Sequence, residues 1–433
     1  MFYLSALVGR RITAKGGSTV ARLTDVVTCL ETPATSEAEG EKEQAVLRVK
    51  GLVARTGPLG KPRFVPASVV SSLDAHGVRL HVASLDLQPF ERRDGQVLLT
   101  KDLWDKQIID LKSRRVVRVN DIILDNKSGK QDVGWHVSGV DIALGALLRR
   151  IKLAWALEAL IRRPVGAQVI EWADMDLFAS NVPGSMKVEH AKLATLHPVE
   201  IARLTDAVSY HQGAEIIASL HDTLAADTLE EIAAERQTDI VDQIPEEHAA
   251  DIIEEMAPDA ATDLISELPE KKAAALLEEM NEERAADVRQ LLRYPDHTAG
   301  RAMTTDFVCV RPRMTVGEVI EANKPRFLST DLIYYMYVTA SEEDDKLVGV
   351  ITVRDLLVQS QDTPVSDFML TTFLAVRAGE HERAVARKMA EYNLLALPVV
   401  DRNGNLLGVV TIDDALDSLL PEGWKKHLPR IFN

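Results

Sequence analysis

The chain has 433 residues, which is long enough for several domains with ordinary hydrophobic cores. Hydrophobic residues make up 46% and charged residues 27%, proportions typical of a globular protein, and the formal net charge is −16. No stretch of about eighteen residues is free of charge, so the sequence predicts no transmembrane helix. The basic residues at the N-terminus follow its apolar run, the reverse of a secretory signal. We therefore expect a soluble cytoplasmic protein, working free or at the inner face of the membrane.

The first 148 residues are rich in short strand-like segments. Residues 4–88 contain several such segments separated by glycine-rich turns, which predicts a small β-barrel over residues 1–92. Residues 97–148 repeat this pattern of short strand-like segments and predict a second barrel over residues 95–148. The matching positions are Arg22, Leu23, Thr24 and Asp25 in the first copy and Arg118, Val119, Asn120 and Asp121 in the second.

Both copies resemble PRC-barrel domains, which occur in the H subunit of the photosynthetic reaction centre and in the ribosome-maturation factor RimM. The resemblance implies a docking module, and neither copy contains a cluster of His, Cys or carboxylate residues with catalytic spacing. Two purely structural barrels and a platform that docks a partner both stay open. The sequence pI of about 5.2 argues against RNA as that partner, so we expect no nucleic-acid binding.

Residues 149–190 are predicted to form a helical linker. From residue 145 to residue 163 apolar residues recur at helical spacing, and Pro164 ends the pattern. The polar face of this helix is basic, which is compatible with binding to anionic lipid. A solvated connector is the commoner use of such a pattern.

Residues 191–295 are predicted to form an acidic helical domain. Pieces of about twelve residues recur, and Pro245, Pro258 and Pro269 each open one, as proline can at the first turn of a helix. Each piece is too short to be a stable helix alone, so we expect the helices to stack into a superhelix. Residues 222–287 hold 21 acidic and 4 basic residues, a net charge of −17. One small domain therefore carries essentially the whole charge imbalance, and cations would offset its self-repulsion.

The segment from Ala299 to Leu420 contains a duplicated unit of about 60 residues. Each copy ends in a glycine, a run of β-branched residues, a threonine suited to cap a helix, and an aspartate three residues later. The matching positions are Gly349, Val350, Ile351, Thr352 and Asp355 in the first copy and Gly408, Val409, Val410, Thr411 and Asp414 in the second.

This duplication resembles a tandem pair of CBS domains, which we place at residues 296–361 and 362–422, with a tail at 423–433. The AG-x-x-MT start at residues 299–304 and the acidic helices before it resemble the cytosolic half of the MgtE family of magnesium channels. The resemblance implies a multidomain α+β protein: N-terminal PRC-like β-barrels, an α-helical MgtE N-like superhelix, and a tandem α/β CBS pair.

The resemblance also implies a metal site, because MgtE proteins bind magnesium between the N domain and the CBS pair. Magnesium takes hard oxygen ligands and keeps several waters, so one or two carboxylates per ion suffice. The positions that match the family's ligands are Asp227, Asp259 and Asp263 in the helical domain, and Ala390, Asn393, Asp414 and Asp417 in the CBS pair. Asn393 stands where the family more usually has aspartate, which would weaken that site. His381 and Arg383 stand where the family has acids for a second set of sites, and we expect that set to be absent.

Adenine nucleotide binding is a competing use of the CBS pair. Related CBS domains hold ribose with the aspartate of a T-x-x-D turn, and T-x-x-D is also an ordinary helix-capping pattern. The candidate positions here are Thr352, Arg354, Asp355 and Thr411.

We interpret the chain as a soluble magnesium-sensing regulatory protein associated with divalent-cation transport. Its acidic helical domain would close onto the CBS pair when magnesium is bound. We expect a homodimer through the CBS domains and a separate membrane transporter as partner. The alternatives are a nucleotide-binding CBS adaptor and a ligand-free docking scaffold for a membrane or ribosomal partner. Enzyme signatures such as a P-loop, G-x-S-x-G or HExxH are missing from the sequence, so we expect no catalysis.

Overall fold

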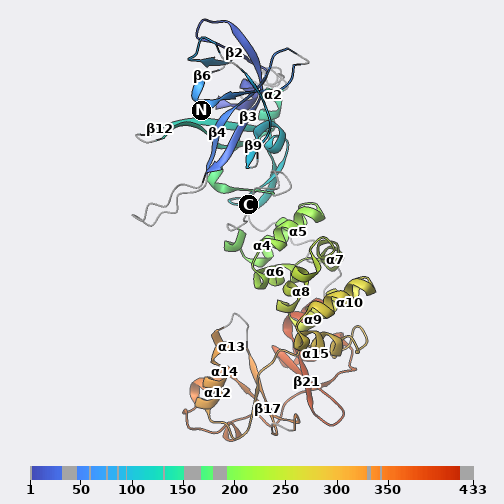
Figure 1. Cartoon of the computed structure of the whole chain (residues 1–433). Coiled ribbons are helices and arrows are strands. Elements are labelled where there is room, and N and C mark those ends of the chain that lie inside the picture. Colours follow the sequence, from blue (N-terminus) through green and yellow to red (C-terminus); the bar gives the residue numbers. More distant parts are fainter. Residues whose placement is uncertain are drawn as a thin grey trace, which may run out of the picture. The chain divides into compact units, whose positions relative to one another are not determined.

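The computed structural model describes residues 2–31, 46–57, 60–74, 77–84, 87–93, 95–129, 132–150, 167–178, 193–328, 333–341 and 344–419. The chain divides into two compact units, Met1–Leu220 and His221–Asn433, and each is described by itself (Figure 1). The mixed α+β class expected from the sequence is confirmed, with a barrel-like sheet at the N-terminus, then short helices, then two small CBS sheets.

The first unit is built on strands, which form a 12-stranded sheet among its described residues. The sheet order is β1-β12-β13-β4-β3-β2-β7-β6, with β14 paired to β13, β5 to β4 and β8, and β9 to β3. The bounds are β1 Phe2–Tyr3, β2 Arg11–Thr13, β3 Thr19–Glu31, β4 Val46–Arg55, β5 Arg63–Pro66, β6 Val70–Asp74, β7 Gly77–Leu80, β8 Gln88–Pro89, β9 Gln96–Leu98, β12 Asp121–Gly129, β13 Asp132–Asp141 and β14 Val169–Glu171. A second sheet has the order β11-β10-β15, formed by Arg115–Arg118, Gln107–Asp110 and Met175–Leu177.

The two sequence repeats exchange their first strands. Strand β1, from the first repeat, pairs with β12 of the second, and β9, from the second repeat, pairs with β3 of the first. A single apolar core therefore runs from Leu4 to Leu177. The two predicted barrels share one sheet and one core, because each half completes the other.

Part of the range predicted as a helical linker is strand. Helix α2 (Leu144–Arg150) begins where the helical pattern begins. Strands β14 and β15 lie within residues 149–190 and pair with β13 and β10, because Ile170, Met175 and Leu177 are buried in the core. The basic helical pattern between residues 151 and 163 lies outside the described residues.

Short helices follow the sheet. Helices α4 (Pro198–Asp206) and α5 (Tyr210–Ala218) close the first unit. The second unit begins with α6 (Asp222–Glu230), α7 (Ala234–Val241), α8 (Glu246–Glu255), α9 (Pro258–Glu267), α10 (Glu270–Glu279) and α11 (Glu282–Leu291). Pro258 is the first residue of α9, and Pro245 and Pro269 cap α8 and α10, so the prolines start helices as predicted. Helices two places apart pack together, α6 on α8, α7 on α9, α8 on α10 and α9 on α11, which buries their apolar faces as a superhelix.

The CBS pair consists of two similar three-stranded sheets. The first has the order β16 (Cys309–Val310), β17 (Tyr335–Thr339) and β18 (Leu347–Thr352), and the second has β19 (Val376–Arg377), β20 (Ala396–Val400) and β21 (Leu406–Thr411). In both, the first pairing is parallel and the second antiparallel. The helices are α12 (Val316–Ala322), α13 (Lys324–Leu328), α14 (Val353–Val358), α15 (Glu382–Tyr392) and α16 (Ile412–Leu419).

Equivalent glycines in the two CBS sheets lie against methionines. A Cβ atom on Gly349 would lie 2.8 Å from Met369 Sδ, and one on Gly408 would lie 2.7 Å from Met303 Sδ. Met303 belongs to the core of the second CBS sheet, together with Ala299 and with Leu291 of α11. The last helix of the acidic superhelix is thus joined to the second CBS sheet by shared apolar packing.

Candidate metal site between acidic helices and the CBS pair

The carboxyls of Asp259 and Asp414 face each other in the second unit. Asp259 lies in the first turn of α9, and Asp414 lies in the first turn of α16. Thr411 donates its hydroxyl to Asp414 Oδ2 at 2.5 Å, so the T-x-x-D turn fixes the orientation of this carboxyl. Asp259 Oδ1 is buried and has no hydrogen-bond partner in the described part of the chain.

The electrostatics of the pair favour a proton or a cation. Burial raises the pKa of Asp259 well above its usual 3.8, and repulsion from Asp414 raises it further. Burial also raises the pKa of Asp414, against the lowering effect of its hydrogen bonds from Thr411. Two buried carboxylates so close together would both be charged only if a cation lay between them.

Glu230 is a third acid of this site, and the sequence analysis did not select it. It lies at the end of α6 and accepts a hydrogen bond from the backbone N–H of Ala257 at 2.8 Å. Burial raises its pKa, that hydrogen bond opposes the rise, and repulsion from Asp227 and Asp414 adds to it. Glu230 stands three residues after Asp227 on one helix face, and this spacing is the signal that could have found it.

The other predicted ligands lie at more exposed positions. Asp227 is exposed on α6, close enough to Glu230 to repel it. Ala390 and Asn393 are exposed at the end of α15, where Asn393 adopts the left-handed conformation that ends the helix. Asp417 lies on α16, which packs against α15, and its side chain lies outside the described residues.

Asp263 already has a cationic neighbour. Its Oδ1 lies 3.0 Å from Nε of Arg301, a residue that is only 6% exposed. The acids selected from the sequence therefore lie in two environments, one turn of α9 apart. Asp259 faces another carboxyl, whereas Asp263 faces a guanidinium.

The arrangement fits a hydrated hard cation. The orphaned Asp259 Oδ1 is an oxygen acceptor that lacks a donor, and Asp414 supplies a second carboxylate opposite it. Among the described residues, no group of three or more His, Cys, Asp or Glu side chains is arranged closely enough to hold a metal ion by itself. Magnesium usually takes one or two carboxylates and keeps its remaining waters, so a facing pair meets its needs.

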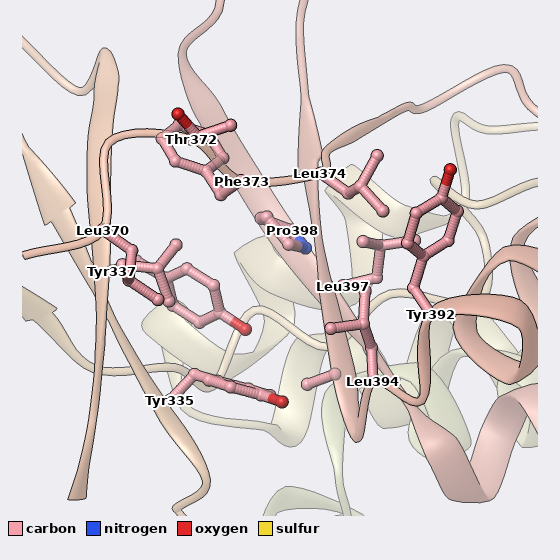
Figure 2. Close-up of a pocket in the computed structure, with 12 residues that line it drawn as sticks. Tyr335, Tyr337, Leu370, Thr372, Phe373, Leu374, Tyr392, Leu394, Leu397 and Pro398 are labelled. Carbon is pink, nitrogen blue, oxygen red and sulfur yellow. The ribbon is translucent and has the colours of Figure 1, made fainter. Parts of the chain in front are cut away.

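A separate pocket lies in the CBS pair (Figure 2). It has a volume of about 420 Å³, and its side chains come from β17, from residues 370–374 and from the segment ending in β20. Tyr335, Tyr337, Phe373, Tyr392 and Pro398 give it a largely apolar and aromatic lining. Tyr337 is 2% exposed, burial raises the pKa of its hydroxyl, and its Oη has no hydrogen-bond partner within the described residues.

The four residues predicted to bind adenine nucleotide differ in their positions relative to this pocket. Thr352 pairs across the sheet with Tyr335, which lines the pocket. Thr352 and Asp355 are bound to each other in a capping box, and Arg354 is exposed. Thr411 donates its hydroxyl to Asp414, one of the two carboxyls that face each other. Thr411 also pairs across its sheet with Ala396, which lines the pocket. Both T-x-x-D threonines therefore adjoin the pocket, and the second T-x-x-D also reaches α9, because Asp414 faces Asp259.

Comparisons with known proteins agree with this architecture. The family model of the MgtE intracellular N domain matches residues 196–297, and that of the CBS domain matches residues 299–361 and 365–421. The magnesium transporter MgtE of Thermus thermophilus is 41% identical over 136 residues, which is 31% of this chain and 30% of that protein. The magnesium transporter MgtE of Enterococcus faecalis is 38% identical over 131 residues, 30% of this chain and 28% of that protein. The chain therefore spans about 30% of the length of these curated relatives.

One solved structure covers the matched region almost completely. The cytosolic domain of the Mg²⁺ channel MgtE in complex with ATP is 31% identical, with a TM-score of 0.51, and the match covers 54% of this chain and 95% of that one. Within the described residues, no helix combines the length and the apolar character needed to cross a bilayer. An acidic superhelix followed by a CBS pair defines a regulatory module of the kind associated with magnesium transport.

The chain belongs to the MgtE family, of which it contains the intracellular N domain and the two CBS domains. The family matches lie within residues 196–421. The resemblance of the first 148 residues to PRC barrels stays a prediction.

Proposed function

We propose that this protein senses magnesium through the carboxyls that face each other between its acidic helices and its second CBS domain, and that it regulates divalent-cation transport. The observation that carries the proposal is the buried Asp259 Oδ1, which has no partner in the described structure and faces Asp414. An oxygen left without a donor destabilises the folded state by about 1–3 kcal/mol. Binding of a divalent cation would remove that cost and the repulsion together.

Each of these residues would have a different role in binding magnesium. Asp259 and Asp414 would contribute oxygen ligands, and Glu230 would add negative charge without direct ligation. Thr411 orients Asp414 by donating its hydroxyl to Oδ2 of that carboxyl. Loss of the ion would leave the carboxylates to repel one another, which would favour separation of α9 from α16. That change of packing is the signal we propose for the transporter in the membrane.

Calorimetry with the full chain tests this proposal. We expect millimolar magnesium binding in the wild type, weakened at least about tenfold, or ~1.4 kcal/mol, in Asp259→Asn and in Asp414→Asn. Asp251→Asn is the matched control, because Asp251 is an exposed acid of the same superhelix on α8. If the three variants bind magnesium as the wild type does, the acids act only through overall charge and the proposed site is wrong.

Adenine nucleotide binding is a second candidate function, and the pocket of Figure 2 favours it. Its aromatic lining suits a flat base, and the partnerless Tyr337 Oη can donate a hydrogen bond to a ligand inside the pocket. The MgtE cytosolic domain named above was solved with ATP. Titration with ATP in the absence of divalent cations should show binding that Asp355→Ala weakens. If heat is measured only when magnesium is added, it reports binding of the metal and not of the nucleotide alone.

We also propose that the CBS pair forms a homodimer. Leu357 and Val358 of α14 are 81% and 73% exposed, and Leu416 and Leu419 of α16 are 49% and 46% exposed. Exposed apolar residues on equivalent helices of the two CBS domains suit a symmetric interface. Light scattering should give a dimer mass for the wild type and a lower mass for Leu357→Glu with Leu416→Glu.

A further inference from the structure

Arg301 is a buried cation that links the acidic superhelix to the second CBS domain. Its side chain is 7% exposed, its Nε lies 3.0 Å from Asp263 Oδ1, and its Nη2 donates to the carbonyl of Thr262 at 3.3 Å. Asp296 adds a longer ion pair at 3.9 Å. Asp263 and Thr262 both belong to α9. The guanidinium is therefore held by the helix that also carries Asp259.

The backbone around Arg301 belongs to the CBS domain rather than to the superhelix. Ala299 donates its backbone N–H to the carbonyl of Glu380 at 2.7 Å, and Gly300 donates to that of Ala378 at 2.8 Å. Thr304 exchanges backbone hydrogen bonds with Val409 of β21. Arg301 thus extends from a segment fixed to the second CBS sheet and reaches α9 with its charged end.

A guanidinium at this position is a permanent charge. Arginine stays protonated at every pH that a folded protein tolerates, and its planar group can bind a carboxylate and a carbonyl at once. The Thr262 hydroxyl donates to the carbonyl of Pro258 at 2.6 Å, and the Thr262 backbone carbonyl, which has two lone pairs, accepts from Arg301. A buried arginine without such partners would be strongly destabilising, so the contact is expected to persist whether or not metal is present.

We propose that Arg301 is a built-in replacement for a divalent cation at Asp263. The proposal rests on the magnesium-sensing function above and narrows it. Asp259 and Asp263 are one helical turn apart, about 6 Å along α9. The middle of α9, at Asp263, is clamped to the second CBS domain by Arg301 without metal. Magnesium controls only the first turn of α9, where Asp259 faces Asp414 and neither carboxyl forms an ion pair with a basic side chain in the described part of the chain.

Two consequences distinguish the clamp from a buried arginine that only supports the fold. In the clamp, removal of Arg301 frees the Asp263 carboxylate, so the chain gains a magnesium ligand and binds an additional ion. Magnesium then restores the contact that the arginine had made. A supporting role predicts lower stability with and without magnesium and no additional ion.

Hydrogen exchange of the α9 amides in the full chain, with EDTA and with magnesium, measures the clamp. We expect α9 of the wild type to be protected in EDTA, and Arg301→Gln to exchange at least about tenfold faster in EDTA and to recover in magnesium. A parallel magnesium titration should give one more ion per chain for Arg301→Gln than for the wild type. Arg293→Gln is the matched control, because Arg293 is an exposed arginine just after α11. It should behave as the wild type does.

Asp263→Asn provides a second variant that does not depend on how well Arg301→Gln folds. It removes the carboxylate and keeps the shape, so α9 should exchange faster in EDTA as in Arg301→Gln, but without the additional ion. The proposal is overturned if Arg301→Gln matches the wild type in EDTA, or if its lost protection is not recovered in magnesium. Failure of the sensing function looks different: the wild type would show no magnesium response, while the comparison in EDTA would still report on the clamp.

Discussion

Ser5 donates its backbone N–H to Asp121 Oδ1 at 3.0 Å, across 116 residues of sequence, and its hydroxyl to Oδ2 of the same carboxyl. Asp25 is the equivalent residue of the first repeat, and Thr100 of the second repeat donates its backbone N–H to Asp25 Oδ1 at 2.8 Å. Each repeat therefore holds the first segment of the other with a buried aspartate. These reciprocal bonds fix the exchange of β1 and β9.

Removal of the Asp121 carboxylate should destabilise the first unit. Asp121 is 0% exposed and also accepts from its neighbour Ile122, so Asp121→Ala would leave buried N–H groups without acceptors. We expect a loss of about 2–4 kcal/mol. Urea unfolding followed by tryptophan fluorescence measures it, because Trp104, Trp135 and Trp172 lie in this unit. Glu171→Ala, an exposed acid of β14, should change the midpoint little; equal losses would mean that the exchange does not depend on this carboxyl.

The facing carboxyls predict how stability depends on pH in the absence of metal. The pKa of Asp259 is raised in the folded state, so between its usual 3.8 and the raised value the folded chain binds more protons than the unfolded chain. Stability should therefore be lost as the pH rises through that window, by about 1.4 kcal/mol for each pH unit. Asp259→Asn lacks this titration and should be more stable than the wild type at pH 7 in EDTA.

Magnesium should make the wild type more stable than Asp259→Asn. The ion stabilises only a chain that binds it, so the wild type should gain stability with magnesium concentration and Asp259→Asn should gain much less. Thermal unfolding at pH 7 with EDTA and with magnesium provides the comparison. If Asp259→Asn were the less stable protein in EDTA, then the Asp259 carboxylate would have a partner that offsets its charge.

Tyr337→Phe should affect stability and ATP binding differently. Its buried hydroxyl has no partner in the described structure, so Tyr337→Phe should leave the ligand-free protein equally stable or more stable by up to about 1 kcal/mol. The same change should weaken ATP binding several-fold if that hydroxyl contacts the ligand. Tyr210→Phe is the control, since Tyr210 of α5 is 49% exposed and does not line the pocket. Lower stability of Tyr337→Phe would show that the hydroxyl has a hydrogen-bond partner, such as a water molecule, in the ligand-free protein.

Three arginines lie opposite one another in the first sheet. Arg22 of β3 pairs with Arg11 of β2 on one side and with Arg55 of β4 on the other. Like charges directly opposite destabilise a sheet, so Arg22→Thr should raise stability by about 0.5 kcal/mol at low salt, and the gain should shrink as salt screens the repulsion. Arg115 pairs with Asp110, and Arg115→Thr should give no such gain. Urea unfolding at two salt concentrations decides between repulsion and a simple preference for threonine in strands.

Periodic and duplicated features of the second unit could be predicted from the sequence. Pro245, Pro258 and Pro269 mark helix starts because proline restricts its own backbone, whatever the fold. The spacing of Thr352 to Asp355 and of Thr411 to Asp414 predicts two capped helices after two strands, and both helices are present. The resemblance to MgtE predicts Asp259 and Asp414 as metal ligands, and the structure brings these two together.

Contacts between distant segments could not be predicted in the same way. A repeat predicts two similar units, but it does not say which copy of the first strand completes which sheet, because both copies carry the same pattern. The helical spacing of Glu230 from Asp227 indicates a shared helix face but not that Glu230 lies near Asp259, and no local signal places Arg301 beside Asp263. The sequence by itself determined the helices, strands, caps and charge of each segment, because these depend on neighbouring residues. Only the tertiary structure decided that Asp259 faces an acid and Asp263 faces an arginine, because burial and distance set the energy of each charge.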